Sequence, residues 1–249
     1  MQIKRAITFV LMMLLTGWCY AGQIERLADG LLIHLKQPAP NGARLVKLQV
    51  VSDKVIHVTA APGDHFNGAP SLMAVDMQGN TVKWDSEENN ETVTLKTASL
   101  WATVALNTGE VVFRDNAGRI ILQEQHGGGK SFAPVNIDGK QLYRIRQAFE
   151  SPAGEAFYGL GQHQTGLMNY KNQDVDLTQY NSVAAVPFVI SNQHYGILWD
   201  NYSITRFGDD QPYEQLSSLH LISKNGQPGG LSATYGNRYN DTVYVKALE

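Results

Sequence analysis

Residues 92–122 read TVTLKTASLWATVALNTGEVVFRDNAGRIIL, and this stretch determines the class of fold that the sequence predicts. Apolar and polar residues alternate in short runs, as expected for strands that bury one face of a sheet. The segments Asn107-Thr108-Gly109 and Asn116-Ala117-Gly118 separate these runs, and their residue types favour tight turns. The stretch therefore predicts an antiparallel meander of strands.

Further strand-like segments lie on both sides of this meander. Upstream, residues 46–50 and 55–58 alternate on either side of a Ser52-Asp53 turn. Further strands are predicted downstream at 186–191, 195–199 and 203–207. No segment beyond residue 21 shows a sustained helical period with caps. The sequence predicts an all-β fold, a sandwich or a barrel, and about 200 residues of this pattern suit one large β-sandwich.

Composition and charge narrow the classes of function. The 20 basic and 23 acidic residues give a net charge of −3, whereas nucleic-acid-binding proteins usually carry a basic excess. The seven histidines are scattered along the chain, and nothing in their placement points to a metal site. We therefore expect no nucleic-acid partner, no cofactor and no metal site.

Two glycine-rich segments resemble nucleotide-binding motifs but lack defining residues. The segment 127–131 (GGGKS) has Glu124 where a phosphate-binding loop has its first glycine, and no helix pattern follows it. The segment 159–161 (GLG) has Gln164 where a dinucleotide fingerprint has its third glycine. We interpret the first as a flexible loop and do not expect NAD binding at the second.

The first 21 residues have the three-part plan of a secretory signal peptide. Lys4 and Arg5 precede an apolar run at 6–15, and the triplet 19–21 (CYA) supplies a cleavage site after Ala21. The run is shorter than the about 20 residues that span a bilayer, so we expect no membrane span. We expect an exported protein, secreted or periplasmic, whose mature chain has no cysteine. In the alternative, Cys19 is a lipidated N-terminus that associates the protein with the outer membrane.

A long polar and aromatic loop at 164–183 lies between strand-like segments. Loops of this length in compact domains are often functional, and tyrosine, asparagine and aspartate can stack on sugar rings and bind their hydroxyl groups. The loop contains Asp174 and Asp176, and Asp209-Asp210 follows further on. Two carboxyl groups about 5–10 Å apart can hydrolyse a glycosidic bond. Surface carboxylates in turns are common as well, so both interpretations stay open.

The order of several motifs resembles the N-terminal β-sandwich of glycoside hydrolase family 31, which contains α-glucosidases and α-xylosidases. The motifs are FYGLG at 157–161, Pro-Phe at 187–188 and YGILWDN at 195–201, with supporting strands at 45–62 and 109–124. The likeness covers roughly residues 24–223 and implies a galactose-mutarotase-like β-supersandwich. The run Gln162-His163-Gln164 is most similar to bacterial α-xylosidases that act on xyloglucan fragments.

In that family the two catalytic aspartates lie on a (β/α)8 barrel, and the barrel's Trp-x-Asp-Met motif is absent from this sequence. A barrel needs about 200 residues or more, so we expect no catalytic residue in this chain. Residues 224–230 (KNGQPGG) read as a linker, and 231–245 resembles the opening of a PA14-type β-module. The expected domains are a signal peptide at 1–21, a β-sandwich at 22–223, and the linker with the truncated module at 224–249.

The resemblance implies the scaffold and substrate-pocket domain of an exported retaining α-glycosidase, an α-xylosidase acting on xyloglucan oligosaccharides. Its partners would be the oligosaccharide and the catalytic barrel of the same polypeptide. The family's pocket-facing loop corresponds to 174–183, where Asp176, Gln179, Tyr180 and Asn181 are expected to line the sugar subsite. The alternative is a free-standing carbohydrate-binding β-sandwich module without hydrolase activity.

Overall fold

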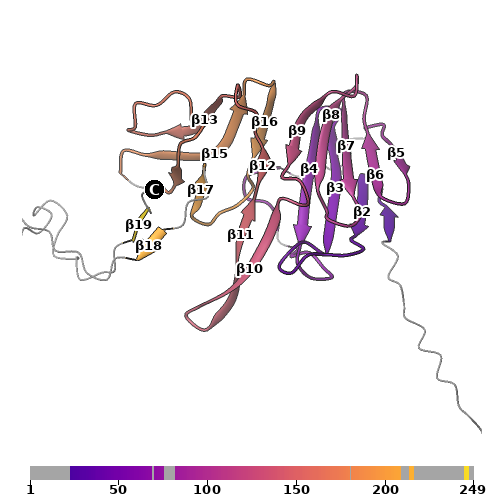
Figure 1. Cartoon of the computed structure of the whole chain (residues 1–249), viewed down its shortest axis with the longest axis horizontal. Coiled ribbons are helices and arrows are strands. Elements are labelled where there is room, and N and C mark those ends of the chain that lie inside the picture. Colours follow the sequence, from indigo (N-terminus) through magenta and orange to yellow (C-terminus); the bar gives the residue numbers. More distant parts are fainter. Residues whose placement is uncertain are drawn as a thin grey trace, which may run out of the picture. The chain divides into compact units, whose positions relative to one another are not determined.

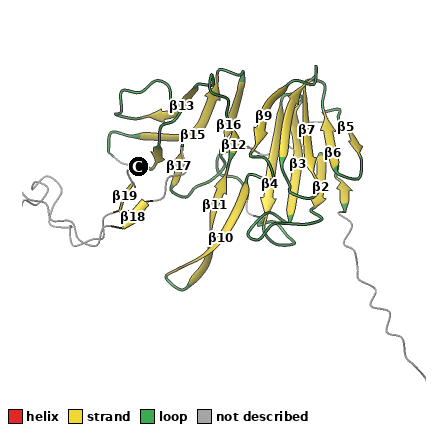
Figure 2. Ribbon diagram, viewed as in Figure 1, coloured by secondary structure: helices red, strands yellow, loops and turns green. Residues whose placement is uncertain are grey.

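The computed structural model describes residues 23–68, 70–75, 82–179 and 181–208, and beyond them only the strands β18 (Tyr213–Gln215) and β19 (Tyr244–Lys246). All regular structure in this part is β-strand (Figure 2), as the sequence predicts. In these ranges no helix is long and apolar enough to cross a membrane. The predicted signal peptide and most of the expected C-terminal module lie outside the described residues.

The chain divides into two compact units, which we describe separately. Unit 1 runs to Glu155 and includes Gln193–Tyr195. Unit 2 contains Ala156–Asn192 and the chain from Gly196 onward. The meander at 92–122 therefore belongs to unit 1, and the long loop at 164–183 belongs to unit 2.

Two antiparallel sheets form the main body of unit 1 (Figure 1). The four-stranded sheet follows chain order with β1 (Ile24–Arg26), β2 (Gly30–His34), β3 (Leu45–Ser52) and β4 (Val55–Ala61). The six-stranded sheet has the order β12-β9-β8-β7-β6-β5, comprising β12 (Phe149–Glu150), β9 (Ile120–Glu124), β8 (Val111–Asp115), β7 (Leu100–Ala105), β6 (Thr92–Lys96) and β5 (Asp85–Glu88). The predicted meander and the hairpin before it are confirmed, and the structure adds β1, β2 and β5.

Side chains from both sheets of unit 1 meet in one hydrophobic core. Along β3, buried residues alternate with partly exposed ones, and Leu48 packs with Leu31 of β2 in the core. Leu95 of β6 and Val104 of β7 enter the same cluster from the other sheet. Full burial of each such side chain contributes about 1.5–3 kcal/mol. The alternation in the sequence thus produces a sandwich core.

A long hairpin of β10 (Lys130–Ile137) and β11 (Lys140–Gln147) extends from unit 1. Figure 1 shows its tip standing away from the two sheets. Phe132 is the side chain of this hairpin that joins the buried core, and its N–H donates to Asn41 O at 2.7 Å. Strand β11 is exposed up to Arg146, so burial alone fixes little of the hairpin's position.

Unit 2 is built from smaller sheets. One has β15 (Ala184–Ser191) between β13 (Phe157–Gln162) and β16 (Tyr195–Leu198), the second pairs β14 (Val175–Leu177) with β17 (Thr205–Phe207), and the third pairs β18 with β19. The predicted strands at 186–191, 195–199 and 203–207 are confirmed with somewhat different bounds. The hydrophobic core here is the small cluster of Leu160, Tyr170, Val175 and Val189.

A β-bulge explains the glycines of the FYGLG motif. The pairing of β13 with β15 shifts register between Gly159 and Gly161, and Gly159, Leu160 and Gly161 have φ angles of 114°, 63° and 95°. A Cβ on Gly161 would lie 1.9 Å from Ala184 O, a clash that only glycine avoids. The bulge leaves Leu160 in the core, at 2% exposure. These glycines therefore have a structural role in the sheet.

Candidate functional site

The loop between β13 and β15 carries all four residues predicted to bind sugar. Strand β14 divides this loop and pairs with β17, which places Asp176 opposite Arg206. Val175 is buried, and Phe207 packs edge-on against Phe157 with ring centroids 5.5 Å apart. Because side chains alternate along a strand, burial of Val175 turns Asp176 outward.

Asp176 lies at the surface beside a fixed cation. Its side chain is 55% accessible, and Arg206 Nε donates to its Oδ1 at 3.2 Å. A carboxylate has about four lone-pair sites, so Asp176 can accept a further hydrogen bond from a hydroxyl group. Ion pairs at such exposure contribute at most about 1 kcal/mol. The pair therefore orients Asp176 more than it stabilises the fold.

Gln179 fastens the end of the loop to the chain that follows it. Its Nε2 donates to Val183 O at 2.5 Å, and its Oε1 accepts from Ala185 N at 3.1 Å. Both ends of the amide are thus directed at the backbone that enters β15. Gln179 therefore shapes the loop, and a direct contact with sugar stays a prediction.

Tyr180 and Asn181 complete the predicted set. Tyr180 lies outside the described residues. Asn181 is exposed, next to Ser182, whose φ angle of 69° turns the chain sharply before β15. Asp176, Gln179 and Asn181 therefore share one loop, and their assignment to a sugar subsite stays a prediction.

Asp174 and Asp176 lie in different surroundings. Both carboxylate oxygens of Asp174 are buried, and a Cβ on Gly208 would lie 2.8 Å from Asp174 Oδ1, whereas Asp176 faces solvent. The two residues therefore do not offer a pair of carboxyl groups to one substrate. Asp209 and Asp210 lie outside the described residues. Within the described ranges, no group of three or more His, Cys, Asp or Glu side chains could hold a metal ion.

Three histidines of the described residues lie beside carboxylates: His34 beside Glu25, His65 beside Asp64 and His126 beside Glu110. His34 Nε2 lies 3.1 Å from Glu25 Oε1, although linear spacing suggests no such pair. The contact arises because β1 and β2 are antiparallel neighbours. Pairing across a hairpin brings together residues whose separation in sequence depends on the turn, so spacing rules for a single strand miss it.

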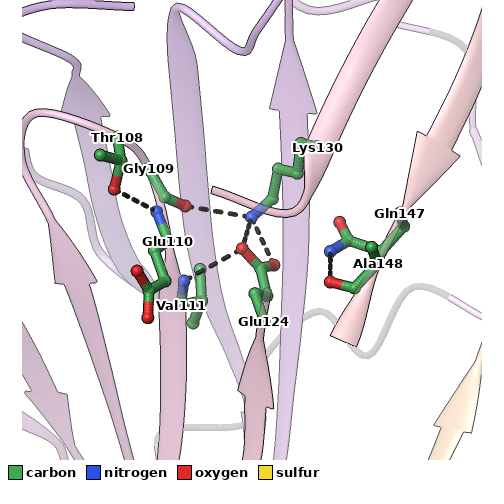
Figure 3. A network of polar contacts seen from close by, with 8 residues as sticks. All are labelled: Thr108, Gly109, Glu110, Val111, Glu124, Lys130, Gln147 and Ala148. Atoms are coloured by element: carbon green, nitrogen blue, oxygen red, sulfur yellow. Dashed lines mark hydrogen bonds and ion pairs between the residues drawn. The ribbon is translucent and has the colours of Figure 1, made fainter. Parts of the chain in front are cut away.

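The segment 127–131 ends in a buried polar network and not in a free loop (Figure 3). Lys130 Nζ forms an ion pair with both carboxylate oxygens of Glu124 and donates to Gly109 O at 3.1 Å. Glu124 Oε2 also accepts from Val111 N at 3.0 Å. The two charged side chains are only 8% and 4% accessible. The lysine that a phosphate-binding loop would offer to a ligand is therefore used inside the protein.

Burial controls the titration of this pair. Desolvation raises the pKa of Glu124, although Lys130 opposes the shift. Desolvation likewise lowers the pKa of Lys130, against the attraction of Glu124. A second carboxylate, Glu110, accepts from Gln123 Nε2 at 3.0 Å and from Gly127 N at 2.9 Å. Sequence reasoning missed this network because its members come together only where the paired strands β8 and β9 meet the start of β10.

A small cavity of about 170 Å³ lies in unit 1. Its polar lining includes Gln123, Glu150, Glu155 and Tyr195. Glu155 is buried and accepts hydrogen bonds from Ser151 Oγ and Tyr195 OH, each at 2.5 Å. Sites for drug-sized ligands measure about 300–1,000 Å³, so this cavity is too small for an oligosaccharide.

Comparison with known proteins gives a consistent family match. A family model described as the glycosyl hydrolase 31 N-terminal galactose mutarotase-like domain matches residues 45–207. An α-xylosidase from Saccharolobus solfataricus is 28% identical over 169 residues, which are 64% of this chain and 22% of that protein. An uncharacterized family 31 glucosidase from Pseudescherichia vulneris is 31% identical over 148 residues, which are 51% of this chain and 28% of that protein.

A solved structure shares the same architecture. The GH31 α-xylosidase from Xanthomonas citri superposes with a TM-score of 0.69 at 43% identity, over 82% of this chain and 22% of that chain. The chain thus spans between 22% and 28% of the length of these relatives.

Proposed function

Because the chain belongs to the glycosyl hydrolase 31 family through its N-terminal galactose mutarotase-like domain, we propose that it is the scaffold and substrate-pocket wall of a glycosidase. The parent enzyme is a retaining α-glycosidase that releases α-linked xylose from xyloglucan oligosaccharides through a glycosyl-enzyme intermediate. The observation that carries the proposal is the 43% identity, over 82% of this chain, with the Xanthomonas citri α-xylosidase.

The proposal divides the work between this chain and a barrel. The two catalytic carboxylates belong to a (β/α)8 barrel that continues the same polypeptide, and this chain supplies the loop at 174–183 to the mouth of that barrel. This division is supported by the chain's length, which matches only 22–28% of the length of its relatives. The surroundings of Asp174 and Asp176 agree with it, since the two carboxylates do not form a catalytic pair.

One face of the β13-β15-β16 sheet supports the scaffold role. Exposed apolar side chains gather on this sheet, each between 39% and 48% accessible: Tyr158, Val186, Phe188, Ile190 and Leu198. The three of these side chains that belong to β15 alternate with more buried ones, so they share a face. Contiguous apolar surface of this kind marks an interaction site. In the proposal, the catalytic barrel covers this face.

The test of the activity is kinetic. The full-length parent enzyme should hydrolyse p-nitrophenyl α-xyloside with a kcat/KM at least about tenfold above that for the α-glucoside, since a pocket shaped for a pentose excludes the extra hydroxymethyl group. It should also release xylose from xyloglucan oligosaccharides. A preference for the glucoside contradicts the xylosidase proposal, and hydrolysis of neither substrate contradicts the glycosidase proposal.

The sugar subsite has its own test. In the full-length enzyme, Asp176→Ala, Gln179→Ala, Tyr180→Ala and Asn181→Ala should raise KM or lower kcat. Arg119→Ala is the control, because Arg119 is 82% accessible in unit 1, outside this loop. Unchanged kinetics in all four variants would remove the subsite assignment but leave the glycosidase proposal intact.

We also propose that the protein is exported, on the strength of the charged, apolar and small-residue segments in 1–21. The mature N-terminus, read by mass spectrometry from the exported protein, should be Gly22. A retained Met1 contradicts export by this route. A diacylated Cys19 in the membrane fraction would support lipidation instead.

A further inference from the structure

The buried pair Lys130–Glu124 sits at the root of the β10–β11 hairpin, where each leg leaves the six-stranded sheet (Figure 3). Lys130 is the first residue of β10 and stands opposite Gln147, the last residue of β11. Just outside this pair, Ala148 N donates to Gly129 O at 2.8 Å. The ion pair therefore joins the hairpin root to β9 and, through Gly109 O, to the turn before β8.

The apolar pattern of the hairpin cannot fix its position by itself. Side chains alternate along a strand, so a shift of β10 by one residue along the sandwich would move Phe132 out of the core. A shift by two residues keeps every side chain on the same face of the strand. The alternation of apolar and polar residues therefore does not prevent it. Leu142, Tyr143 and Ile145 of β11 are 45–54% exposed in the native position and so add little preference for one register over another.

The buried charges oppose the two-residue shift. If β10 moved by two residues in one direction, Lys130 would occupy the core position of Phe132 without an anion. If it moved in the other direction, Phe132 would cover Glu124, leaving a buried carboxylate unpaired. Either state buries an uncompensated charge, which is far more costly than the native pairing.

The neighbouring glycines fit this reading. A Cβ on Gly129 would lie 2.2 Å from Ala148 O, and one on Gly128 would lie 2.9 Å from Thr108 O. The backbone at Gly128 and Gly129 therefore lies very close to the neighbouring segments. This close approach lets Lys130 Nζ reach Glu124 when β10 is in its native position. The GGGKS segment supplies the tight approach and the charge together.

We propose that Lys130 and Glu124 are positioning residues that specify where the β10–β11 hairpin sits, and that they do not add to the stability of the sandwich. The directions of their pKa shifts agree, because desolvation outweighs the mutual attraction for both groups. Buried ion pairs that define a register at some cost in stability are known from other folds.

The test replaces both charges in the 249-residue chain. Glu124→Gln/Lys130→Met keeps an acceptor for Val111 N and fills the space of the lysine stem. The double variant should unfold at the same denaturant concentration as the parent or a higher one. Hydrogen exchange of the Phe132 amide, which bonds to Asn41 O, should accelerate about tenfold or more. Amides of Val93 and Val104, in the paired strands β6 and β7, should exchange as before.

Arg119→Met is the matched control, because it removes the cation of an exposed ion pair with Asp115 in the same sheet. It should change neither the unfolding midpoint nor the exchange of Phe132. Two outcomes overturn the proposal. In one, the double variant unfolds at a clearly lower denaturant concentration, which makes the pair a stabiliser. In the other, the Phe132 amide keeps its protection, which means that packing alone fixes the hairpin.

Discussion

The two units of the chain differ in the size of the hydrophobic core that each one buries. Unit 1 closes two sheets on a shared core, and even its charged pair Glu124–Lys130 is enclosed. Unit 2 has a small core around Leu160 and Val189, while β15 exposes Phe188 and Ile190. Since burial of apolar surface is the main favourable contribution to folding, we expect the larger core to make unit 1 the more stable of the two. The apolar side chains that β15 exposes are those that the proposed catalytic barrel would cover.

The largest change in stability is expected when the buried charge pair of unit 1 is broken. Lys130→Met alone leaves Glu124 buried without its cation and should lower the free energy of unfolding by about 3–5 kcal/mol. Urea unfolding followed by tryptophan fluorescence measures it. A loss below about 1 kcal/mol would mean that water reaches Glu124 in the variant.

The same variant should respond to pH in a defined direction. Burial raises the pKa of Glu124 above its ordinary value of 4.5, so the folded state holds this proton more tightly than the unfolded state. The contribution of Glu124 to stability is therefore full below pH 4.5 and is lost as the pH rises through the folded-state pKa. The deficit of Lys130→Met should be smaller at acid pH than at neutral pH, and a pH-independent deficit would contradict this.

The hydrophobic core of unit 1 gives the next largest effect. Leu48→Ala removes a fully buried side chain and should cost about 2–5 kcal/mol. Hydrogen exchange in the parent chain sharpens the comparison, because the Leu48 amide should exchange more slowly than the Val189 amide of unit 2. Equal exchange of the two amides would show that the smaller core is no weaker than the larger one.

The bulge of unit 2 gives an intermediate effect. Gly161→Ala places a Cβ 1.9 Å from Ala184 O, which forces the backbone to shift, and does so at a φ of 95°; the strained φ alone costs on the order of 1–3 kcal/mol, so we expect at least this loss. Gly154→Ala is the control, since nothing lies within 4 Å of its added Cβ and its φ is not in the left-handed region. Circular dichroism melts of both variants distinguish backbone strain from a general effect of replacing glycine.

The smallest effect is expected for the exposed ion pair of unit 2. A double-mutant cycle of Asp176→Asn and Arg206→Met should give a coupling of about 0.2–1 kcal/mol, well below that of the buried pair in unit 1. The coupling should weaken further in high salt because both groups are near solvent. A coupling above about 2 kcal/mol would place this pair in the same class as Glu124–Lys130.

Much of the fold could be predicted because alternation is a local property. The strands of the meander and of β3 and β4 follow from the period-two pattern of their own residues, and β15 follows from its short apolar run. The hairpin β10–β11 could not be found in this way, since its strands expose apolar residues among charged ones and have no single buried face. The ion pair at its root depends on contacts between three strands.

In the candidate loop, too, some features could be predicted from the sequence and others could not. Its length, its aromatic and polar residues and its place between two strands are visible in the sequence. The division of labour within it is not, because Gln179 bonds to backbone groups whose position depends on the turn at Ser182 and on the start of β15.

The sequence by itself determined the all-β class, the order of most strands and the likeness to a glycosidase domain, because these depend on residues read one segment at a time. Only the tertiary structure could assign the FYGLG glycines to a bulge and the lysine of GGGKS to a buried ion pair. Both assignments rest on close approach between segments distant in the chain, where a missing Cβ or an enclosed charge acquires its meaning from its neighbours.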